Sequence, residues 1–503
     1  MRKSIIILIL ALTLLSISFV SANENATDLE INALENDVIL DEEPLKEVND
    51  TAVENVKEDS TITANSVTGY EKFSTEFNIT LTSNGKNLSS KKVIINLNGK
   101  NYTRSTNEFG QASLNIKLQK GNYAVNFYYS GNDKYNPSNG SAEITIKEPK
   151  NTVLKQADKD INYRQGLKSV FIVRLLSETG YSVKNRTVTF KVNGKTYSAT
   201  TDSKGYAQIF LSLKKGTYKV SYSFKSDKPY LSSNGSAKIK VKASMGKGNG
   251  YWMWGSGMKS VSLKTLKQKG TKQIFLHSYA VSLYGKSAVT SWIAQAKKYG
   301  MNVHIWVQCF YDGKWIRPVK DDGSPDYYLM KKKAAKVVNY AKIKGVAGVH
   351  LDYVRFGGTA HLYKDSMKAI NYMVKKTCTE VRKVSPNCII SAAIMPEPDM
   401  MEYYYGQDIP TITKYLDVIV PMAYKGNYKM KTPWIGEVTR NFTLQSNGAQ
   451  VWTGIQSYVS DDNAVRLSHS TLVNDAKVAM NGGAKGVVLF RIGITNLLNF
   501  YKV

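Results

Sequence analysis

Two acidic residues in the C-terminal half of the sequence stand where apolar, strand-like segments end. Asp352 follows the segment 348–351, and Glu397 follows the segment 392–396. Two carboxyl groups that flank a glycosidic bond suffice for its hydrolysis, because one protonates the leaving oxygen while the other acts as nucleophile or base. We therefore predict Asp352 and Glu397 as a catalytic pair. Asp312 and Asp399 on nearby loops are alternatives for the second carboxyl group, and a salt bridge to Arg355 is the alternative role for Asp352.

Aromatic and polar side chains recur at the ends of the other strand-like segments of this half. Flat aromatic faces stack on the C–H faces of sugar rings, while amide and guanidinium groups bind hydroxyl or carboxylate groups. One such aromatic residue is more often part of a core, so the argument rests on recurrence. We predict that substrate is bound by Trp252, Trp254, Tyr279, Gln308, Tyr353, Arg355, Tyr424, Gln456, Tyr458, Phe490 and Arg491.

Histidine offers a different chemistry. His277, His304 and His350 lie on successive strand-like segments, and Asp352 follows His350 by two residues. His and Asp side chains from adjacent strands can hold a zinc ion for amide or deacetylation chemistry. The sequence has no HxH or HExxH spacing, however, so we expect no metal and no other cofactor. Hydrogen-bonded core histidines, or one His that stabilises a sugar hydroxyl, are the favoured interpretations.

The few cysteines of the sequence limit both the disulfides and the thiol nucleophiles that the protein can have. Three cysteines in 503 residues exclude a disulfide-stapled scaffold. Cys309 ends a strand-like segment, but the sequence places no His and Asn beside it that would activate a thiol nucleophile. Cys378 and Cys388 are ten residues apart, and a disulfide between them is left open.

The elements that must position these residues alternate between apolar strands and amphipathic helices. Eight such units in 253 residues predict a (β/α)8 barrel over 251–503, in which functional groups stand at the carboxyl ends of the strands. An open doubly wound sheet is the alternative, but no glycine-rich phosphate loop follows the first strand. Helices are expected at 287–299, 327–344 and 362–384, and strands at 251–254, 273–279, 302–310, 346–356, 388–396, 417–424, 450–458 and 486–492.

The preceding segment contains a duplication. Residues 93–100 return as 188–195, and residues 139–142 return as 234–237, each 95 positions further along. Polar and apolar residues alternate, and the Asn-Gly pairs at 98–99 and 193–194 predict tight hairpins. Two immunoglobulin-like β-sandwiches are therefore expected, at 66–148 and 149–243, joined to the barrel by a Gly-rich linker at 244–250. They resemble the tandem repeats of adhesin-like surface proteins. A stalk is the favoured role, with direct ligand binding as the alternative.

The N-terminus predicts export. Basic residues at 2–3, an apolar run at 5–20 and small residues up to Ala22 indicate a signal peptide at 1–22, and the run is short for a membrane span of about 20 residues. Residues 23–60 carry 13 acidic and 2 basic residues, so 23–65 is expected to be a disordered spacer. The whole chain has a net charge of +28, so residues 61–503 carry a net charge of +37. This positive charge favours an anionic glycan or wall polymer as partner, while export excludes nucleic acid.

Nine Asn-X-Ser/Thr sequons, eight of them before residue 240, fit an exposed and glycosylated N-terminal half.

Four segments of the expected barrel resemble one family. Residues 345–356 are similar to the fourth-strand motif of glycosyl-hydrolase-like barrels related to family 18 chitinases. Their sequence is Gly-Val-Ala-Gly-Val-His-Leu-Asp-Tyr-Val-Arg-Phe. Residues 416–424 resemble their sixth strand, and 453–458 and 486–490 resemble strands seven and eight. The resemblance implies that Asp352 is an active-site acid, that Met422 and Tyr424 line the cleft, and that amino-sugar glycans are the substrates.

The sequence departs from the chitinase pattern at two acidic positions. Chitinases carry Glu two residues after the last Asp of the fourth strand, where Val354 stands here, and Asp after the sixth-strand Tyr, where Lys425 stands. The chitinase reaction, in which the N-acetyl group of the substrate attacks, is therefore not expected. Together the sequence predicts an exported, monomeric glycoside hydrolase on an immunoglobulin-like stalk. The alternative is a non-catalytic glycan-binding adhesin.

Overall fold

The computed structural model describes residues 56–503, so the predicted signal peptide and most of the predicted spacer lie outside the described residues. The first β unit follows, and its first strand already begins within the range expected for the spacer. Two sheets enclose one core: β1, β3, β4 and β7 form one, and β2, β5, β6, β8 and β9 form the other. The strands are β1 (Ser60–Ala64), β2 (Val67–Tyr70), β3 (Thr75–Ser83), β4 (Lys86–Asn87), β5 (Lys92–Leu97), β6 (Lys100–Ser105), β7 (Gln111–Ile116), β8 (Gly121–Tyr129) and β9 (Ser138–Lys147).

The second β unit repeats this arrangement around its own core. Its sheets have the orders β10-β11-β14 and β13-β12-β15-β16. Both predicted hairpins are confirmed: Asn98 and Asn193 have positive φ angles of 52° and 50° and precede glycines that also have positive φ. The strands are β10 (Thr152–Gln156), β11 (Ser169–Ser177), β12 (Thr187–Val192), β13 (Lys195–Thr200), β14 (Tyr206–Leu211), β15 (Gly216–Phe224) and β16 (Ser233–Val241).

The predicted barrel is confirmed. Parallel strands pair in the order β17-β18-β19-β20-β21-β22-β24-β27, and β27 pairs with β17 to close the ring. They are β17 (Gly250–Met253), β18 (Gln273–His277), β19 (Asn302–Gln308), β20 (Gly348–Asp352), β21 (Ile389–Ile394), β22 (Val418–Ala423), β24 (Thr453–Gln456) and β27 (Val487–Phe490). Short strands β23 (Gln450–Val451), β25 (Tyr458–Ser460) and β26 (Asn463–Arg466) accompany them.

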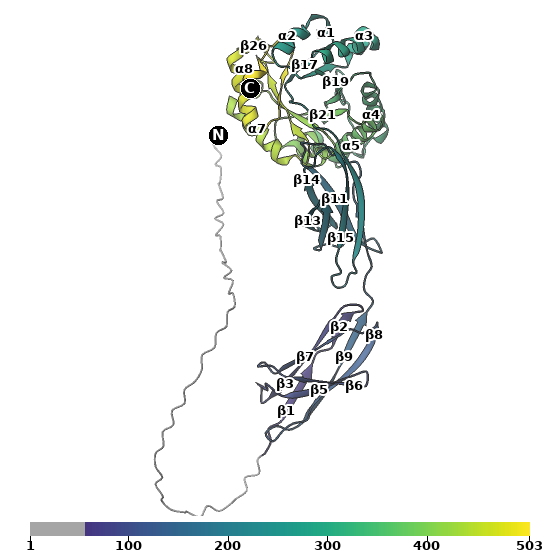
Figure 1. Ribbon diagram of the computed structural model, residues 1–503. Helices are drawn as coiled ribbons and strands as arrows, with labels where there is room; N and C mark the ends of the chain where they lie inside the picture. The colour runs from purple at the N-terminus through teal and green to yellow at the C-terminus, as the bar shows by residue number, and fades with distance from the viewer. Residues whose placement is uncertain (1–55) are drawn as a thin grey trace, which may run out of the picture.

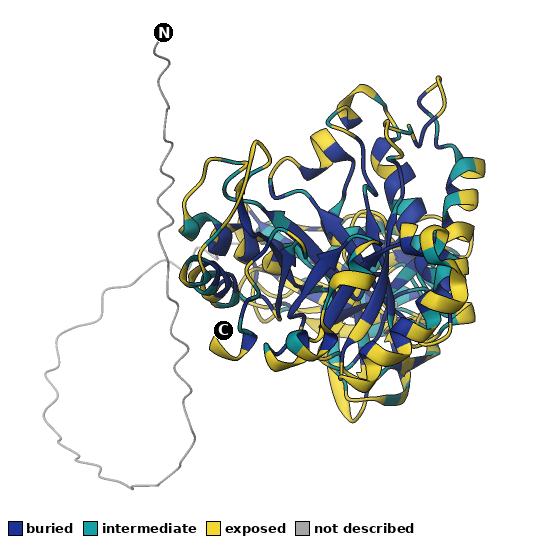
Figure 2. Ribbon diagram, turned by 90° about the horizontal axis from the view of Figure 1, so that it is seen from above, coloured by how far each residue is buried: buried dark blue, intermediate teal, exposed yellow. Residues whose placement is uncertain are grey.

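Helices surround the barrel with their outer faces exposed and the strands buried (Figure 2). An apolar face every 3.6 residues gives each helix one side that packs on the strands. Gly285, with a φ of 78°, interrupts the helical geometry within α3. The helices are α1 (Gly257–Ser260), α2 (Leu263–Gln268), α3 (Tyr279–Lys298), α4 (Tyr327–Ala341), α5 (Ser366–Val384), α6 (Ile409–Ile412), α7 (Thr432–Gln445) and α8 (His469–Asn481), with short helical turns at Ala360–Leu362, Met401–Tyr405 and Phe500–Lys502.

Large side chains fill the interior of the barrel. Trp252, Phe275, Trp306 and Trp452 belong to one buried cluster inside the ring of strands. A Cβ on Gly454 would lie 2.9 Å from the Trp252 ring, so only glycine lets this strand approach the indole. The interior of the barrel is therefore a packed core of side chains, as in other barrels of this size.

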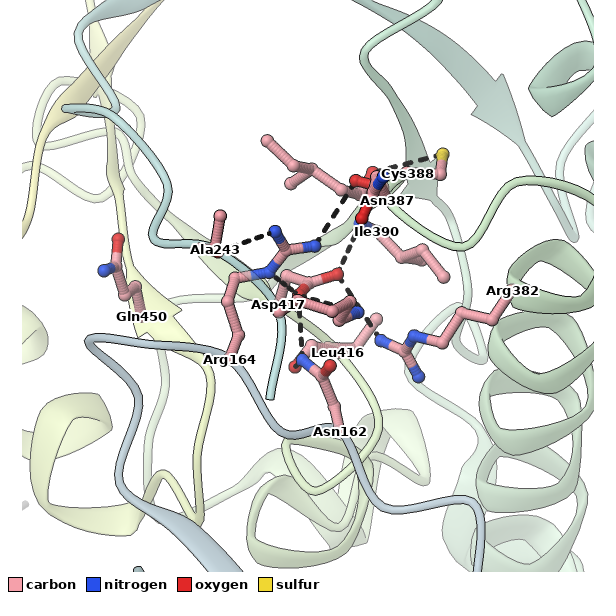
Figure 3. Close-up of polar contacts among 12 residues, drawn as sticks. Asn162, Arg164, Ala243, Arg382, Asn387, Cys388, Ile390, Leu416, Asp417 and Gln450 are labelled. Carbon is pink, nitrogen blue, oxygen red and sulfur yellow. Dashed lines mark hydrogen bonds and ion pairs between the residues drawn. The ribbon is translucent and has the colours of Figure 1, made fainter. Parts of the chain in front are cut away.

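The second β unit lies against the barrel (Figure 1). A buried carboxylate, at the end of the barrel where the strands begin, joins the two parts (Figure 3). Asp417, which precedes β22, is fully buried and bonds Arg164 Nε at 2.7 Å and Asn162 Nδ2 at 2.8 Å, both from the β unit. Lys242 Nζ lies 3.6 Å away, and Arg382 of α5 lies 3.4 Å away. Burial by itself raises the pKa of Asp417, but these three cations hold it well below its ordinary value.

The segment expected as a linker is packed against the barrel. Gly248 donates its N–H to Lys485 O at 3.0 Å, and a Cβ on Gly248 would overlap the Trp452 ring. At the same interface, Asp158 accepts hydrogen bonds from Lys375 at 2.9 Å and from the Tyr415 hydroxyl at 2.6 Å. The second β unit and the barrel therefore share a buried, polar interface.

Three further expectations concern cysteines and membranes. Cys378 and Cys388 are both buried free thiols, so the disulfide that the sequence left open is not formed. Cys309 is also buried, and burial raises the pKa of its thiol to about 12, which disfavours a nucleophilic thiolate. Among residues 56–503, no helix combines the length and apolarity that a membrane span requires.

Candidate active site

A cavity of about 250 Å³ lies at the carboxyl ends of the barrel strands. Ten of the residues predicted from the sequence line it: Trp252, Trp254, Gln308, Asp352, Tyr353, Arg355, Met422, Tyr424, Tyr458 and Phe490. They are brought together because parallel strands in a closed barrel present all their carboxyl ends on one face. The structure adds seven lining residues that the sequence did not indicate: Trp306, Ala393, Met395, Pro396, Asn427, Tyr428 and Asp461.

Asp352 is the buried acid of this cavity. Its side chain is only 7% exposed, at the last position of β20. One carboxylate oxygen accepts a hydrogen bond from Trp306 Nε1 at 2.9 Å, and the other accepts from the Tyr353 N–H at 2.7 Å. Burial raises the pKa of Asp352, while these hydrogen bonds and the charge of Arg355 oppose the shift. The carboxyl group is therefore held in place with its proton affinity increased, as a general acid requires.

The backbone after Asp352 is also unusual. Tyr353 has a φ of 50°, which a bulky residue rarely adopts. This conformation aims the Tyr353 N–H at the Asp352 carboxylate and lets the Tyr353 ring stack on Tyr311, with centroids 4.7 Å apart. Backbone strain of this kind concentrates at functional sites. The turn after the fourth strand thus holds Asp352 and Tyr353 at the cavity.

Arg355 does not form the salt bridge that was the alternative role for Asp352. Among the described residues, no Lys, Arg or His nitrogen lies within 4.0 Å of the Asp352 carboxylate. The Arg355 guanidinium instead lies over the rings of Trp315 at 4.8 Å and Tyr405 at 5.4 Å. Burial lowers the pKa of Arg355, and the negative charge of Asp352 partly offsets this. No cation of the described residues is therefore paired with the Asp352 carboxylate, which is left free to face the cavity.

The walls of the cavity are largely aromatic. Trp254 packs against Trp306 with centroids 4.9 Å apart, and Tyr424 packs against Phe490 at 5.6 Å. The buried ring of Trp252 packs edge-on against Phe490, with ring centroids 5.9 Å apart. Flat apolar walls with a few polar groups are what a sugar-binding pocket needs, because sugar rings have both C–H faces and hydroxyl edges.

Glu397 does not line the cavity. Its Oε1 accepts hydrogen bonds from the Tyr428 hydroxyl at 2.8 Å and the Tyr405 hydroxyl at 3.0 Å. Its other oxygen is buried and has no hydrogen-bond partner in the described part of the chain. Burial and the Glu397 charge together raise the pKa of Tyr405 to about 12. Because Tyr428 does line the cavity, Glu397 stands behind this tyrosine and orients its hydroxyl group.

Asp461 is the second acid of the cavity. It follows β25, is exposed, and accepts hydrogen bonds from the Tyr458 hydroxyl at 2.5 Å and from Asn427 Nδ2 at 2.8 Å. The sequence signal was weak, because Asp461 lies in a polar turn three residues beyond the predicted seventh strand. Trp306 was easier to find: it stands two residues before Gln308 on the same strand, and alternate residues share a face.

Three predicted binding residues lie outside the cavity lining. Tyr279 is 55% exposed in a neighbouring depression that also contains Gln308. Gln456 is buried, and its Oε1 accepts from the Gly426 N–H at 2.9 Å, so it holds the loop after β22. The Arg491 guanidinium lies 5.7 Å from the centre of the Trp254 ring.

The histidines form hydrogen bonds within the barrel. His304 Nε2 lies 2.8 Å from Gln273 Oε1, and His350 Nδ1 lies 2.8 Å from Ser391 Oγ. Burial lowers the pKa of His304 to about 3 and that of His350 well below its ordinary value. His277, nearer the rim, lies 3.2 Å from Gln308 Oε1. Within the described part of the chain, no three His, Cys, Asp or Glu side chains are grouped so that they could hold a metal ion.

The two departures from the chitinase pattern have structural roles. Val354 is fully buried in the large core that surrounds the barrel. Lys425 Nζ donates to the buried Asp475 of α8 at 2.7 Å and to Thr432 at 2.9 Å. Neither residue lines the cavity, so these positions supply no acid to it.

Comparisons with known proteins find similarity only at the level of shape. No family model matches the chain, and no curated protein matches it. A family 18 chitinase from Cycas revoluta, solved with (GlcNAc)4, is 8% identical over 49% of this chain and 95% of its own, with a TM-score of 0.38. The Bacillus cereus spore cortex-lytic enzyme SleL is 10% identical over 53% and 76%, with a TM-score of 0.37. Fibronectin(III)-like modules of Clostridium thermocellum CbhA are 17% identical over 36% and 94%, with a TM-score of 0.24. These values are too low to carry a substrate or mechanism over to this chain.

Proposed function

We propose that the barrel is a glycoside hydrolase that cleaves an amino-sugar-containing polysaccharide. The observation that carries this proposal is Asp352, a buried carboxyl group that opens into an aromatic-walled cavity and has no ion-pair partner among residues 56–503. A binding site alone needs no such group, because burying an acid costs free energy that only a function or a partner offsets. The motif around Asp352 resembles chitinase-related barrels, which directs the proposal to amino-sugar glycans.

In the proposed reaction, protonated Asp352 gives its proton to the glycosidic oxygen as the bond to the anomeric carbon breaks. Its raised pKa suits this role. The positive charge that develops on the sugar is opposed by a carboxylate, for which Asp461 is our candidate because it lines the same cavity. Water then supplies the hydroxyl group at the anomeric carbon, and its proton returns to a carboxylate. Glu397 contributes by holding Tyr428 at the cavity wall.

The experiment measures reducing ends released from purified cell-wall glycan by the full chain. We expect Asp352→Asn and Asp461→Asn each to lower the rate by about 10²- to 10⁴-fold. Glu397→Gln should have a smaller effect, because it keeps one acceptor for Tyr428. Asp462→Asn is the matched control, since this neighbouring exposed acid does not line the cavity. Release by Asp352→Asn at the wild-type rate would remove Asp352 from the reaction and refute the proposal.

A second function is favoured by one observation: Glu397, predicted as the partner of Asp352, does not line the cavity. A barrel with one buried acid could bind glycan without cleaving it, as an adhesin does. The same experiment separates the two functions. Retained glycan binding with no release of reducing ends from the wild-type protein would favour the adhesin.

We further propose that the protein is exported and that the two β units are immunoglobulin-like modules that hold the barrel away from a surface. The signal-like N-terminus and the repeat in the sequence support this. The repeated two-sheet architecture and the packed interface at Asp417 suit a stalk, because the barrel is then attached through a buried contact. Localisation of the full chain in the source cells, by antibody against the barrel, tests this proposal.

A further inference from the structure

The second β unit carries a basic groove that the proposed hydrolysis does not use. It has a volume of about 710 Å³ and lies along the edge where β10 and β16 meet. Lys155, Lys159, Lys238 and Lys240 line it, and all four are exposed. Apolar side chains of the sandwich core, such as Ile239, form its floor. An adjoining depression shares Tyr222 and Ser236 with the groove and adds two more lysines, Lys191 and Lys219.

The first β unit provides an internal comparison, because the two units arose by duplication. Residues 152–242 contain 18 Lys and Arg against five Asp and Glu, whereas residues 57–147 contain 11 against seven. Part of this difference in charge lies at the groove itself. By strand register, Thr63 is the equivalent of Lys155, and Glu143 and Thr145 are the equivalents of Lys238 and Lys240. The fold therefore does not require these lysines.

One pair of lysines works against the stability of the sheet. Lys219 and Lys238 stand directly opposite each other on β15 and β16, both on the exposed face. Like charges at such positions destabilise an antiparallel pair. The equivalent pair in the first unit is Ala124 and Glu143, which carries no such repulsion. An arrangement that costs stability in one copy of a repeat and is absent from the other suggests a ligand of opposite charge.

The acidic residues of the second unit do not neutralise the groove. Asp158 and Asp160 face Lys375 of the barrel at 2.9 and 3.6 Å, and Asp227 pairs with Arg186 at 3.0 Å. Among the described residues, the four groove lysines have no carboxylate within 4.0 Å. The groove thus presents uncompensated positive charge on a hollow surface lined by side-chain hydroxyl and amide groups such as Ser236 and Gln156.

We propose that this groove binds a linear anionic glycan, a polymer whose sugar or polyol units carry carboxylate or phosphate groups. Four ammonium groups along one edge match repeated negative charges, and the neighbouring hydroxyl and amide groups match the uncharged hydroxyls of such a chain. The site lies on the β unit, whereas the barrel cavity opens at the opposite ends of the barrel strands from the face that this unit contacts. The second β unit is therefore a binding module in its own right.

The test is titration of the full chain with polygalacturonate, which carries carboxylates, and with poly(glycerol phosphate), which carries phosphates. Dextran is the neutral control polymer. The groove variant changes Lys155, Lys159, Lys238 and Lys240 to Gln. The matched control variant changes four exposed lysines of the same unit that lie outside the groove: Lys184, Lys195, Lys204 and Lys225.

We expect the groove variant to bind the preferred anionic polymer about tenfold more weakly, because each exposed charge pair contributes roughly twofold to an equilibrium constant. The control variant, which loses the same net charge, should stay within about twofold of wild type. Equal weakening in the two variants would show that net charge alone attracts the polymer and would overturn the proposal. Equal binding of dextran, or failure of wild type to bind either anionic polymer, would overturn it as well. Asp352→Asn should bind like wild type, so loss of hydrolysis and loss of groove binding are separate results.

Discussion

The buried Asp417 cluster makes a quantitative prediction about how the barrel and the second β unit are held together. Asp417→Asn keeps the shape of the side chain but removes the negative charge that Arg164, Lys242 and Arg382 share. The buried Arg164 and the partly buried Lys242 and Arg382 then face one another without a counter-charge. Removing one partner of a buried ion pair costs about 3–5 kcal/mol, because the remaining charge stays desolvated. We expect a loss of this size in the free energy of unfolding at pH 7.

Lys242→Met is the matched control, because it removes a cation from the same cluster. Lys242 Nζ is buried and forms no hydrogen bond with any described residue, and burial lowers the pKa of Lys242 to about 8. The other two cations still pair with Asp417, so this substitution should change the free energy of unfolding by less than about 1 kcal/mol or increase it. Both substitutions alter the ion pairs of the same carboxylate, but their effects on the free energy of unfolding are expected to differ severalfold.

Urea unfolding followed by tryptophan fluorescence measures both variants, since all seven tryptophans lie between residues 252 and 452 and report on the barrel. Far-UV circular dichroism of the full chain, recorded in the same titration, shows whether the remaining secondary structure is lost in the same transition as the tryptophan signal. The reasoning is refuted if Asp417→Asn costs less than about 1 kcal/mol. It is refuted equally if Lys242→Met costs as much as Asp417→Asn, because the cluster would then depend on cation number and not on its carboxylate.

Three further predictions follow from single contacts. Trp306→Phe removes the N–H that bonds Asp352, so the pKa of Asp352, measured by carboxyl NMR titration, should rise further; an unchanged pKa would contradict the role of this hydrogen bond. Gly454→Ala places a Cβ 2.9 Å from the Trp252 ring and should lower the free energy of unfolding by about 1–3 kcal/mol, whereas a stability equal to wild type would show that the ring can shift. Because the pKa of Lys242 is lower in the folded than in the unfolded protein, its unfavourable effect is complete below pH 8 and disappears as the pH rises toward 10.5. Wild type should therefore gain stability relative to Lys242→Met over this range, and a constant difference would argue against a charged, buried lysine.

Local patterns in the sequence were sufficient to predict the barrel strands, the turns and ten of the seventeen residues that line the cavity. The Asn-Gly turns depend on two residues that tolerate positive φ, and the strands depend on runs of apolar residues. The rule that parallel strands present their carboxyl ends on one face then placed Asp352 at a cavity together with Trp254 and Tyr424. These conclusions need no knowledge of how any side chain packs.

Tertiary structure decided where the remaining charged groups point. Glu397 also follows a strand, but two tyrosines from other segments bind it and turn it away from the cavity. Asp461 reaches the cavity from a turn whose path depends on Asn427 and Tyr458. Asp417 acquires its role from Arg164, which lies 253 positions earlier in the chain. Strand formation follows from short-range backbone preferences, whereas the direction of a charged side chain follows from partners that only the folded chain brings near.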